Sequence, residues 1–374
     1  MNENFLFDEE RENDDIILVD DIVKLNNRNL KEIKVEKPDI NEARFLIDNY
    51  YQIQQMRINT ANQIRALSQG ADNKSSKEEL NDNKITTSML LFNQYCTMED
   101  NAKKLLQNFI DSNYLSRWAS KVTGIGPVLA ASLAAYLHIE KEEDGSTKMH
   151  AGSWWSYAGL TDNNRVWLGS TKSKELVEQA IKECGGVLND EAMMLICARS
   201  KWKLDHFKNF KDCYKETKKG AKWNKEAVIK ACSLIPYNKE LKVVCHKIGQ
   251  SFHKVCNNDK SLYGKLFKER LQYELEKNEN GDYAEQAATI LKTKNFSSKE
   301  VKEVYESGKL PMSHIYKRCE RYVTKLFISH AFEAAYFNEY KVMPPKPYIL
   351  MFSEGKHNDY IAPEIPYDES LWNK

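Results

Sequence analysis

The feature that most constrains the fold is a pair of apolar segments joined by a Gly-Ile-Gly-Pro turn, in the run YLSRWASKVTGIGPVLAASLAAYL from Tyr114 to Leu137. The first segment predicts an amphipathic helix that ends near Val122. Pro127 suits the first position of a following helix, because its φ is fixed and its missing N–H would have no helical acceptor there. An alanine-rich second helix is therefore expected through Leu137, and the small side chains would let the two helices approach closely.

The turn between these helices has the properties of an anion-binding site. Gly124 and Gly126 lack Cβ atoms, so their backbone N–H groups can come close to a phosphate. The partial positive charge at the start of the next helix acts at the same place. The pattern predicts a helix-hairpin-helix that contacts the DNA backbone without reading base sequence, and a plain turn between helices is the alternative. The expected contact residues are Thr123, Gly124, Ile125, Gly126 and Val128.

Helical spacing of apolar residues covers much of the remaining chain and predicts a mainly α fold. Two amphipathic segments flank a polar stretch at 69–83 and predict a long antiparallel helical hairpin, which serves either as a dimerising arm or as bundle core. The expected regions are an acidic, poorly ordered tail (1–40), the helical arm (41–110), the helix-hairpin-helix region (111–173), a basic helical insertion (174–235), a helical C-terminal region (236–342) and an extended tail (343–374).

Several local signals refine this organisation. Ser153 is a candidate N-cap for a short helix that stops at Gly159. Helices are expected over 239–255, 263–276 and 313–340, with a turn at 278–282. Pro344, Pro345 and Pro347 cannot continue the last helix, so the tail is expected to run extended over the surface.

Composition excludes several classes of protein. No apolar run approaches the roughly 20 residues of a membrane span, and the N-terminus lacks signal-peptide features, so an intracellular, cytoplasmic protein without membrane contact is expected. The eight Cys form no CxxC pair, which favours reduced thiols over disulfides or a zinc ribbon. The net charge of +1 hides a segregation between the acidic first 40 residues and a lysine-rich stretch after residue 200.

The motifs resemble those of a known family. The runs GIGPVLAASLAAYL and WWSYAGL (154–160) resemble the C-terminal domain of the bridge-RNA-guided insertion-sequence transposases, the group founded on insertion sequences one-ten, one-sixteen and nine-oh-two. Three later runs resemble phage-borne and chromosomal proteins labelled transposase-like: NKELKVVCHKIGQSF (238–252), YGKLFKERLQYE (263–274) and LPMSHIYKRCERYVTKLFISHAF (310–332). The resemblance implies a DNA-binding protein of a mobile element, phage or defence locus, connected with DNA recombination.

Two departures from that family concern its chemistry. The family's nuclease-like N-terminal domain, which supplies four metal-binding acidic residues, needs more than about 100 residues, whereas only about 40 precede the first long helix. We therefore expect that domain to be absent. The family also carries a serine nucleophile shortly after its SYAGL-like segment, and Ser170 and Ser173 are the nearby candidates, although surface serines of no catalytic role are far commoner.

Two basic clusters are further candidates for phosphate contact. His314, Arg318, Arg321 and Lys325 follow a 4-3-4 spacing that places them on one helix face, with a solvated face as the alternative. Lys218, Lys219 and Lys222 combine charge with the rings of Trp202 and Trp223, as in single-strand binders, and a solvated helical pair is the alternative.

Other candidate ligands are weaker. Cys245, His246, His253 and Cys256 would not share one face of a helix, so no metal site is expected, and no cofactor is evident. Trp154 and Trp155 are expected in the core rather than stacked on bases.

Three functions therefore compete. A DNA-binding, transposase-like protein explains the most residues. A DNA glycosylase or nuclease acting on phage or modified DNA is the second, although Pro127 and Val128 stand where hairpin glycosylases carry a basic residue, and only Asp144, in an exposed-looking run, stands near their usual aspartate. The third is a non-enzymatic adaptor whose arm forms a homodimer and which binds DNA or RNA.

Overall fold

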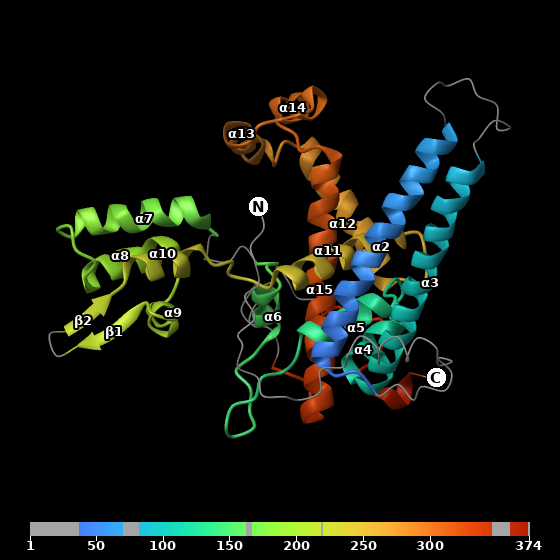
Figure 1. The fold of residues 1–374 in the computed structure, drawn as a ribbon, viewed down its shortest axis with the longest axis horizontal. Helices are drawn as coiled ribbons and strands as arrows, with labels where there is room; N and C mark the ends of the chain where they lie inside the picture. Colours follow the sequence, from blue (N-terminus) through green and yellow to red (C-terminus); the bar gives the residue numbers. More distant parts are fainter. Residues whose placement is uncertain (1–36, 70–81, 162–166, 218–219, 346–359, 373–374) are drawn as a thin grey trace. The chain divides into compact units, whose positions relative to one another are not determined.

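The structure is a computed structural model that describes residues 37–69, 82–161, 167–217, 220–345 and 360–372 (Figure 1). Within these ranges the chain is mostly helical, and its single sheet has two strands, which confirms the expected mainly α class. The expected acidic tail lies almost entirely outside the described residues. No described helix is long and apolar enough to cross a membrane.

A long helical hairpin opens the described chain, as predicted. Helix α2 (Ile40–Gln69) packs along α3 (Asp82–Ser112), and Figure 1 shows them side by side in blue and teal. At their interface the buried carboxylate of Glu99 accepts hydrogen bonds from Tyr50 Oη at 2.9 Å and Arg57 Nε at 2.5 Å. Most of the polar stretch expected to separate the helices lies outside the described residues.

The helix-hairpin-helix segment folds with the predicted bounds. Helix α4 (Tyr114–Lys121) begins after Asn113, whose side chain accepts from Ser116 N, and it ends at Val122. Helix α5 (Pro127–Tyr136) begins at the predicted proline, with Gly126 as its N-cap. Helix α5 is buried over most of its length, because α2, α3, α4 and α11 all pack against it. Its alanines make this close packing possible, as expected.

The helix after this hairpin begins earlier than predicted. Helix α6 (Ala151–Tyr157) has His150 rather than Ser153 as its N-cap. Ser153 is the third residue of the helix, and its hydroxyl oxygen accepts from the backbone N–H of His150 at 3.3 Å in a capping box. Gly159 follows the helix with a φ of +63°, which agrees with the predicted stop.

The C-terminal helices close the main core. Helix α15 (Met312–Tyr340) packs against α4, α6, α11 (Lys239–Lys254) and α12 (Leu262–Glu279). The turn expected at 278–282 begins later, because the Asn278 side chain is buried and bonds both the N–H and the carbonyl of Leu310, at 2.8 and 2.9 Å. Two shorter helices, α13 (Ala284–Thr293) and α14 (Lys299–Glu306), were not predicted.

The region expected to be an all-helical insertion contains a β-hairpin, so that expectation was wrong in part. Its helices are α7 (Gly169–Glu183), α8 (Asp190–Ser200), α9 (Leu204–Asn209) and α10 (Lys225–Ser233). Strands β1 (Tyr214–Thr217) and β2 (Gly220–Trp223) pair antiparallel, with Tyr214 opposite Trp223. The boundary expected at residue 174 falls inside α7. This region has its own apolar core, which includes Val177, Met193, Ile196, Phe207 and Val228.

Of the segment expected to form an extended tail, residues 346–359 lie outside the described residues, and residues 360–372 are mostly irregular backbone with exposed or half-buried side chains. Over residues 360–372 the chain packs on α4 and α15 and ends in a short 3-10 helix, η1 (Glu369–Leu371). Tyr367 is buried there, and the indole of Trp118 donates to the Ile365 carbonyl at 3.0 Å. The segment is held because it supplies apolar area and an acceptor for a buried indole N–H.

Candidate nucleic-acid interface

Gly124 is required by both its backbone and its surroundings. Its φ of +100° is one that residues with a Cβ rarely adopt. A Cβ at this position would lie 3.1 Å from Val255 Cγ2 and 3.6 Å from Phe252 Cδ1. The Ser251 hydroxyl donates to the Gly124 carbonyl, so the turn is fastened to α11. Gly124 therefore serves the packing of the turn as much as any contact with a ligand.

Gly126 has a different environment. Its φ of −78° is ordinary, and a Cβ there would meet no atom of the described residues within 4 Å. Across the described part of the chain, the N–H groups of Gly126, Val128 and Leu129 have no hydrogen-bond acceptor, as is usual in the first turn of a helix. The open side of the turn is thus the start of α5.

Two of the expected backbone contacts are already occupied inside the protein. The N–H of Ile125 donates to the Val122 carbonyl at 3.0 Å, and that of Thr123 donates to Glu364 Oε1 at 2.6 Å. The side chains of Ile125 and Val128 are buried, so Val128 offers only its N–H. The predicted contact set is therefore corrected: the N–H groups of Thr123 and Ile125 hold the turn, whereas those of Gly126 and Val128 have no acceptor among the described residues.

A cavity of about 690 Å³ opens in front of this turn. Gly124, Gly126 and Pro127 line it, together with Lys103 from α3 and Lys247 and Lys254 from α11. These lysines were missed in the sequence, because the fold brings them together from two distant helices. The seven-residue spacing of Lys247 and Lys254, which returns to the same helix face, was the available signal.

The three lysines are held differently. Lys103 is 3.1 Å from Asp100 and 3.7 Å from Glu99, so its charge is partly balanced. Lys247 Nζ lies 3.4 Å from the ring centre of Tyr51, and burial lowers the pKa of Lys247. Lys254 is exposed, and neither it nor Lys247 forms an ion pair with any described residue. An incoming anion would therefore gain from two cations that no carboxylate neutralises.

The residues of the predicted basic face of α15 have different surroundings, so they do not form one continuous phosphate-binding surface. Arg318 Nε lies 2.6 Å from the buried carboxylate of Glu274, and its guanidinium covers the ring of Tyr283 at 4.5 Å. Arg318 is thus part of an internal ion pair rather than a free phosphate ligand, which corrects the expectation. Lys325 lies 5.6 Å from the ring centre of Trp155. Arg321 is exposed and lines a separate cavity.

The aromatic partners expected beside the insertion's lysines are not available for stacking on bases. Trp223 is buried, and its indole donates to Asp190 at 2.7 Å. Trp202 is buried against His206, with ring centres 3.9 Å apart. Lys222 is exposed on β2, while Lys218 and Lys219 lie outside the described residues.

The remaining candidates separate clearly. Ser170 is exposed in the first turn of α7, whereas Ser173 is fully buried and its hydroxyl has no hydrogen-bond partner among the described residues. Full burial removes Ser173 from contact with a substrate. Trp154 is buried as expected, and Trp155 donates to the Lys325 carbonyl at 2.9 Å. Among the described residues, no group of three or more His, Cys, Asp and Glu side chains is placed to hold a metal ion.

Comparisons of the chain with protein-family models, curated proteins and solved structures found no significant match. The case for a function therefore depends on the residues and the geometry described above.

Proposed function

We propose that the protein binds the backbone of DNA at the start of α5, without reading base sequence. One observation supports the proposal: Gly126 and Val128, whose N–H groups have no acceptor among the described residues, line the same cavity as Lys103, Lys247 and Lys254. A helix N-terminus and lysine side chains both favour an anion, and here they converge on one space.

Each part of this site has a definite task in the proposal. The N–H groups of Gly126 and Val128 donate to a phosphate oxygen, and the open space beside Gly126 lets that oxygen approach. Lys247 and Lys254 neutralise this phosphate and its neighbour along the strand, with release of counterions. The contacts in this proposal go to phosphates rather than to base edges, so the binding is expected to depend on salt more than on sequence.

We further propose that the protein belongs with the transposase-like DNA-binding proteins of mobile elements, phages or defence loci, with an intracellular, DNA-associated location. The shared feature is the backbone-binding hairpin, from α4 through α5, followed by α6 and the SYAGL-like turn. The proposal assigns no strand-transfer role to Ser173, because its side chain is fully buried.

A homodimer through the arm is a second part of the proposal. Three consecutive apolar residues on α3, Met89, Leu90 and Leu91, are 49%, 60% and 44% exposed. On α2, Met56 and Ile58 are 49% and 39% exposed. Exposed apolar side chains in such number favour association with another surface. Light scattering should find a dimer that Leu90→Glu with Leu91→Glu converts to a monomer, and a parent monomer at all concentrations would contradict this part.

The central proposal is tested with Gly126→Val. A Cβ at this position would meet no described atom within 4 Å, so the variant should stay folded, with the parent's circular dichroism. Its side chain would occupy the place of the phosphate oxygen. Affinity for a short duplex, measured by fluorescence anisotropy, should fall at least about tenfold, since each lost N–H contact to a charged oxygen costs about 1.5–3 kcal/mol.

Two further arms complete the experiment. Gly126→Ala, whose side chain is smaller, should lose less affinity than Gly126→Val. The affinity is also measured for duplex DNA, single-stranded DNA and RNA of the same sequence, which shows the kind of nucleic acid that is bound. A scrambled version of each tests whether binding depends on base sequence. Unchanged duplex affinity in folded Gly126→Val would refute the proposal. A strong preference for RNA over DNA would instead favour the RNA-binding adaptor function for this site.

A further inference from the structure

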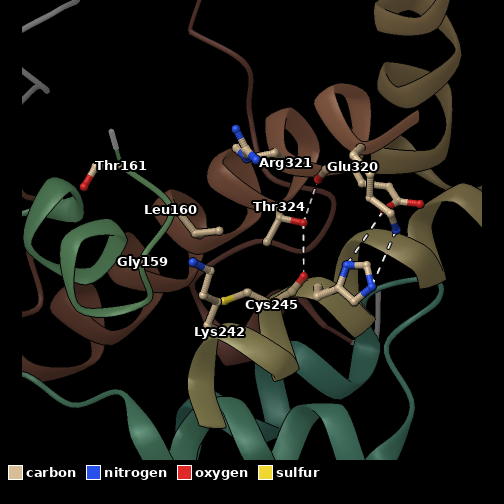
Figure 2. Close-up of a pocket in the computed structure, with 10 residues that line it drawn as sticks. Gly159, Leu160, Thr161, Lys242, Cys245, Glu320, Arg321 and Thr324 are labelled. Carbon is tan, nitrogen blue, oxygen red and sulfur yellow. Dashed lines mark hydrogen bonds and ion pairs between the residues drawn. The ribbon is translucent and has the colours of Figure 1, made fainter. Parts of the chain in front are cut away.

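A second cavity, of about 340 Å³, lies where α11 and α15 meet the turn that follows α6 (Figure 2). Lys242 and His246 of α11 line it, together with Lys317, Glu320 and Arg321 of α15. Three cations, Lys242, Lys317 and Arg321, therefore accompany one carboxylate around this partly open cavity. Such an excess of positive charge at a cavity favours an anionic ligand.

Close packing of the two helices brings these cations together. A Cβ on Gly249 would lie 2.8 Å from Thr324 Oγ1 and 3.1 Å from the Glu320 carbonyl, so only glycine permits this approach of α11 to α15. The Thr324 hydroxyl donates to the Glu320 carbonyl at 2.7 Å beside the crossing. Figure 2 shows Lys242 extending from α11 and Arg321 from α15, with the turn at Gly159 and Leu160 beside them.

The carboxylate is already neutralised by its neighbours. Glu320 is buried, and Lys317 Nζ lies 2.7 Å from its Oε2. His253 Nδ1 lies 3.4 Å from its Oε1, and His246 Nδ1 lies 3.9 Å from its Oε2. The charges of Glu320 and Lys317 offset each other, so Lys242 and Arg321 determine the net charge of the cavity.

These two cations are placed without a carboxylate partner among the described residues. Lys242 Nζ lies 4.0 Å from the ring centre of Tyr237. Tyr237 in turn packs on the backbone of Gly159, where a Cβ would come within 2.8 Å of the ring. Arg321 is exposed and forms no ion pair with any described residue. The turn after α6 therefore holds Lys242 at the cavity, and Arg321 faces it from the second helix.

We infer that this cavity binds a phosphoryl group, in which Arg321 holds two oxygens through its guanidinium and Lys242 holds a third. The planar guanidinium matches two phosphate oxygens, and an ammonium adds a point charge beside them. The volume admits the group together with part of the molecule that bears it. The ligand is either a free phosphate ester or a phosphodiester of nucleic acid. The inference is independent of the proposed function, because it uses no residue of the cavity at α5.

The test is made in the Lys247→Gln, Lys254→Gln background, so that the cavity at α5 contributes little. Isothermal titration calorimetry measures the affinity for inorganic phosphate and for a dinucleotide that has no terminal phosphate. Adding Lys242→Gln and Arg321→Gln should weaken binding at least about tenfold, because two charge-assisted contacts are lost. Adding Lys299→Gln, an exposed lysine on α14, is the matched control and should change nothing.

Circular dichroism and the melting temperature show whether each variant is folded. Binding of phosphate but not of the dinucleotide would identify the ligand as a free phosphate ester, whereas binding of the dinucleotide would identify it as the nucleic-acid backbone. In either case, loss of binding in the variant with Lys242→Gln and Arg321→Gln supports the inference. The inference is overturned if neither ligand binds at about 10 mM, or if the folded Lys242→Gln, Arg321→Gln protein binds as its background does.

Discussion

Glu364 and Thr123 are joined across the hairpin: one carboxylate oxygen of Glu364 accepts from the Thr123 N–H at 2.6 Å. The other oxygen accepts from the Leu262 N–H at 2.8 Å. An acidic residue near the end of the chain thus occupies a backbone donor that a phosphate would otherwise use. It fixes the turn and the start of α12 together, and it places a negative charge next to the proposed DNA site.

Glu364→Gln should therefore tighten DNA binding while it weakens the fold. Removal of a negative charge near the phosphate should raise duplex affinity about fivefold at low salt, which corresponds to about 1 kcal/mol. The amide has one acceptor oxygen for two backbone donors, so the free energy of unfolding should fall by about 1–2 kcal/mol. Anisotropy and urea unfolding measure the two effects. Weaker binding by the folded variant would show that DNA does not approach this side of the turn.

Gly124 and Gly126 should respond differently to alanine. At Gly124 the positive φ and the 3.1 Å approach to Val255 make any side chain unfavourable, so Gly124→Ala should lower the free energy of unfolding by about 1–3 kcal/mol. Gly126→Ala, with an ordinary φ and open space, should change stability by less than about 0.5 kcal/mol. Urea unfolding of both variants is the measurement, and equal effects would contradict the assigned roles.

Because His330 is buried in its neutral form, we expect the protein to lose stability in mild acid. Burial lowers the pKa of His330 from 6.5 to about 4, and its ring bonds the Tyr263 hydroxyl and the Ile361 carbonyl. Below pH 6.5 the unfolded chain takes up a proton that the folded protein excludes. The stability contributed by the neutral ring is therefore present above pH 6.5 and is lost as the pH falls toward 4, by up to about 3 kcal/mol.

The measurement is urea unfolding between about pH 4 and pH 7. This range covers the pKa of His330 in the folded protein, about 4, and its ordinary value of 6.5 in the unfolded chain. His330→Gln should lower stability at pH 7 and flatten its dependence on pH. His138→Gln, at an exposed histidine, should leave that dependence as it is in the parent. If the free energy of unfolding of folded His330→Gln depends on pH as steeply as that of the parent, other groups cause the acid sensitivity.

Arg318 is expected to matter for stability rather than for DNA affinity. Arg318→Ala would leave the fully buried carboxylate of Glu274 with Arg270 and Tyr283 as its remaining partners. Removing one partner of a buried ion pair lowers the free energy of unfolding by about 3–5 kcal/mol. Because Glu274 keeps two partners, we expect a loss at the lower end, about 3 kcal/mol. Thermal unfolding measures it. A stable Arg318→Ala protein with much weaker DNA binding would restore Arg318 as a phosphate ligand.

Local signals in the sequence were enough to predict the hairpin. Pro127 marks the start of α5 and Val122 the end of α4, because proline and the turn glycines act on their own backbone. The partners of these residues could not be predicted in the same way. Glu364 reaches Thr123 from 241 residues away in sequence, and Glu274 reaches Arg318 from 44 residues away.

The β-hairpin and the cations of the two cavities escaped prediction for related reasons. Strands β1 and β2 are four residues each, too short for a clear alternation, and each contains one lysine, which also suits an exposed helix. Lys103 and Lys247 meet only after α3 and α11 have both packed on α5. Periodicity identifies the buried face of each helix, but it does not say which exposed side chains will share a cavity.

The salt dependence of duplex affinity tests the central claim most directly. Lys247→Gln with Lys254→Gln removes two proposed phosphate contacts, whereas Lys239→Gln, an exposed lysine at the start of the same helix, is the matched control. The slope of log affinity against log salt concentration should become shallower by about 2 in the double variant and stay unchanged in the control. A folded double variant with the parent's affinity and slope would contradict the claim that DNA binds at the start of α5.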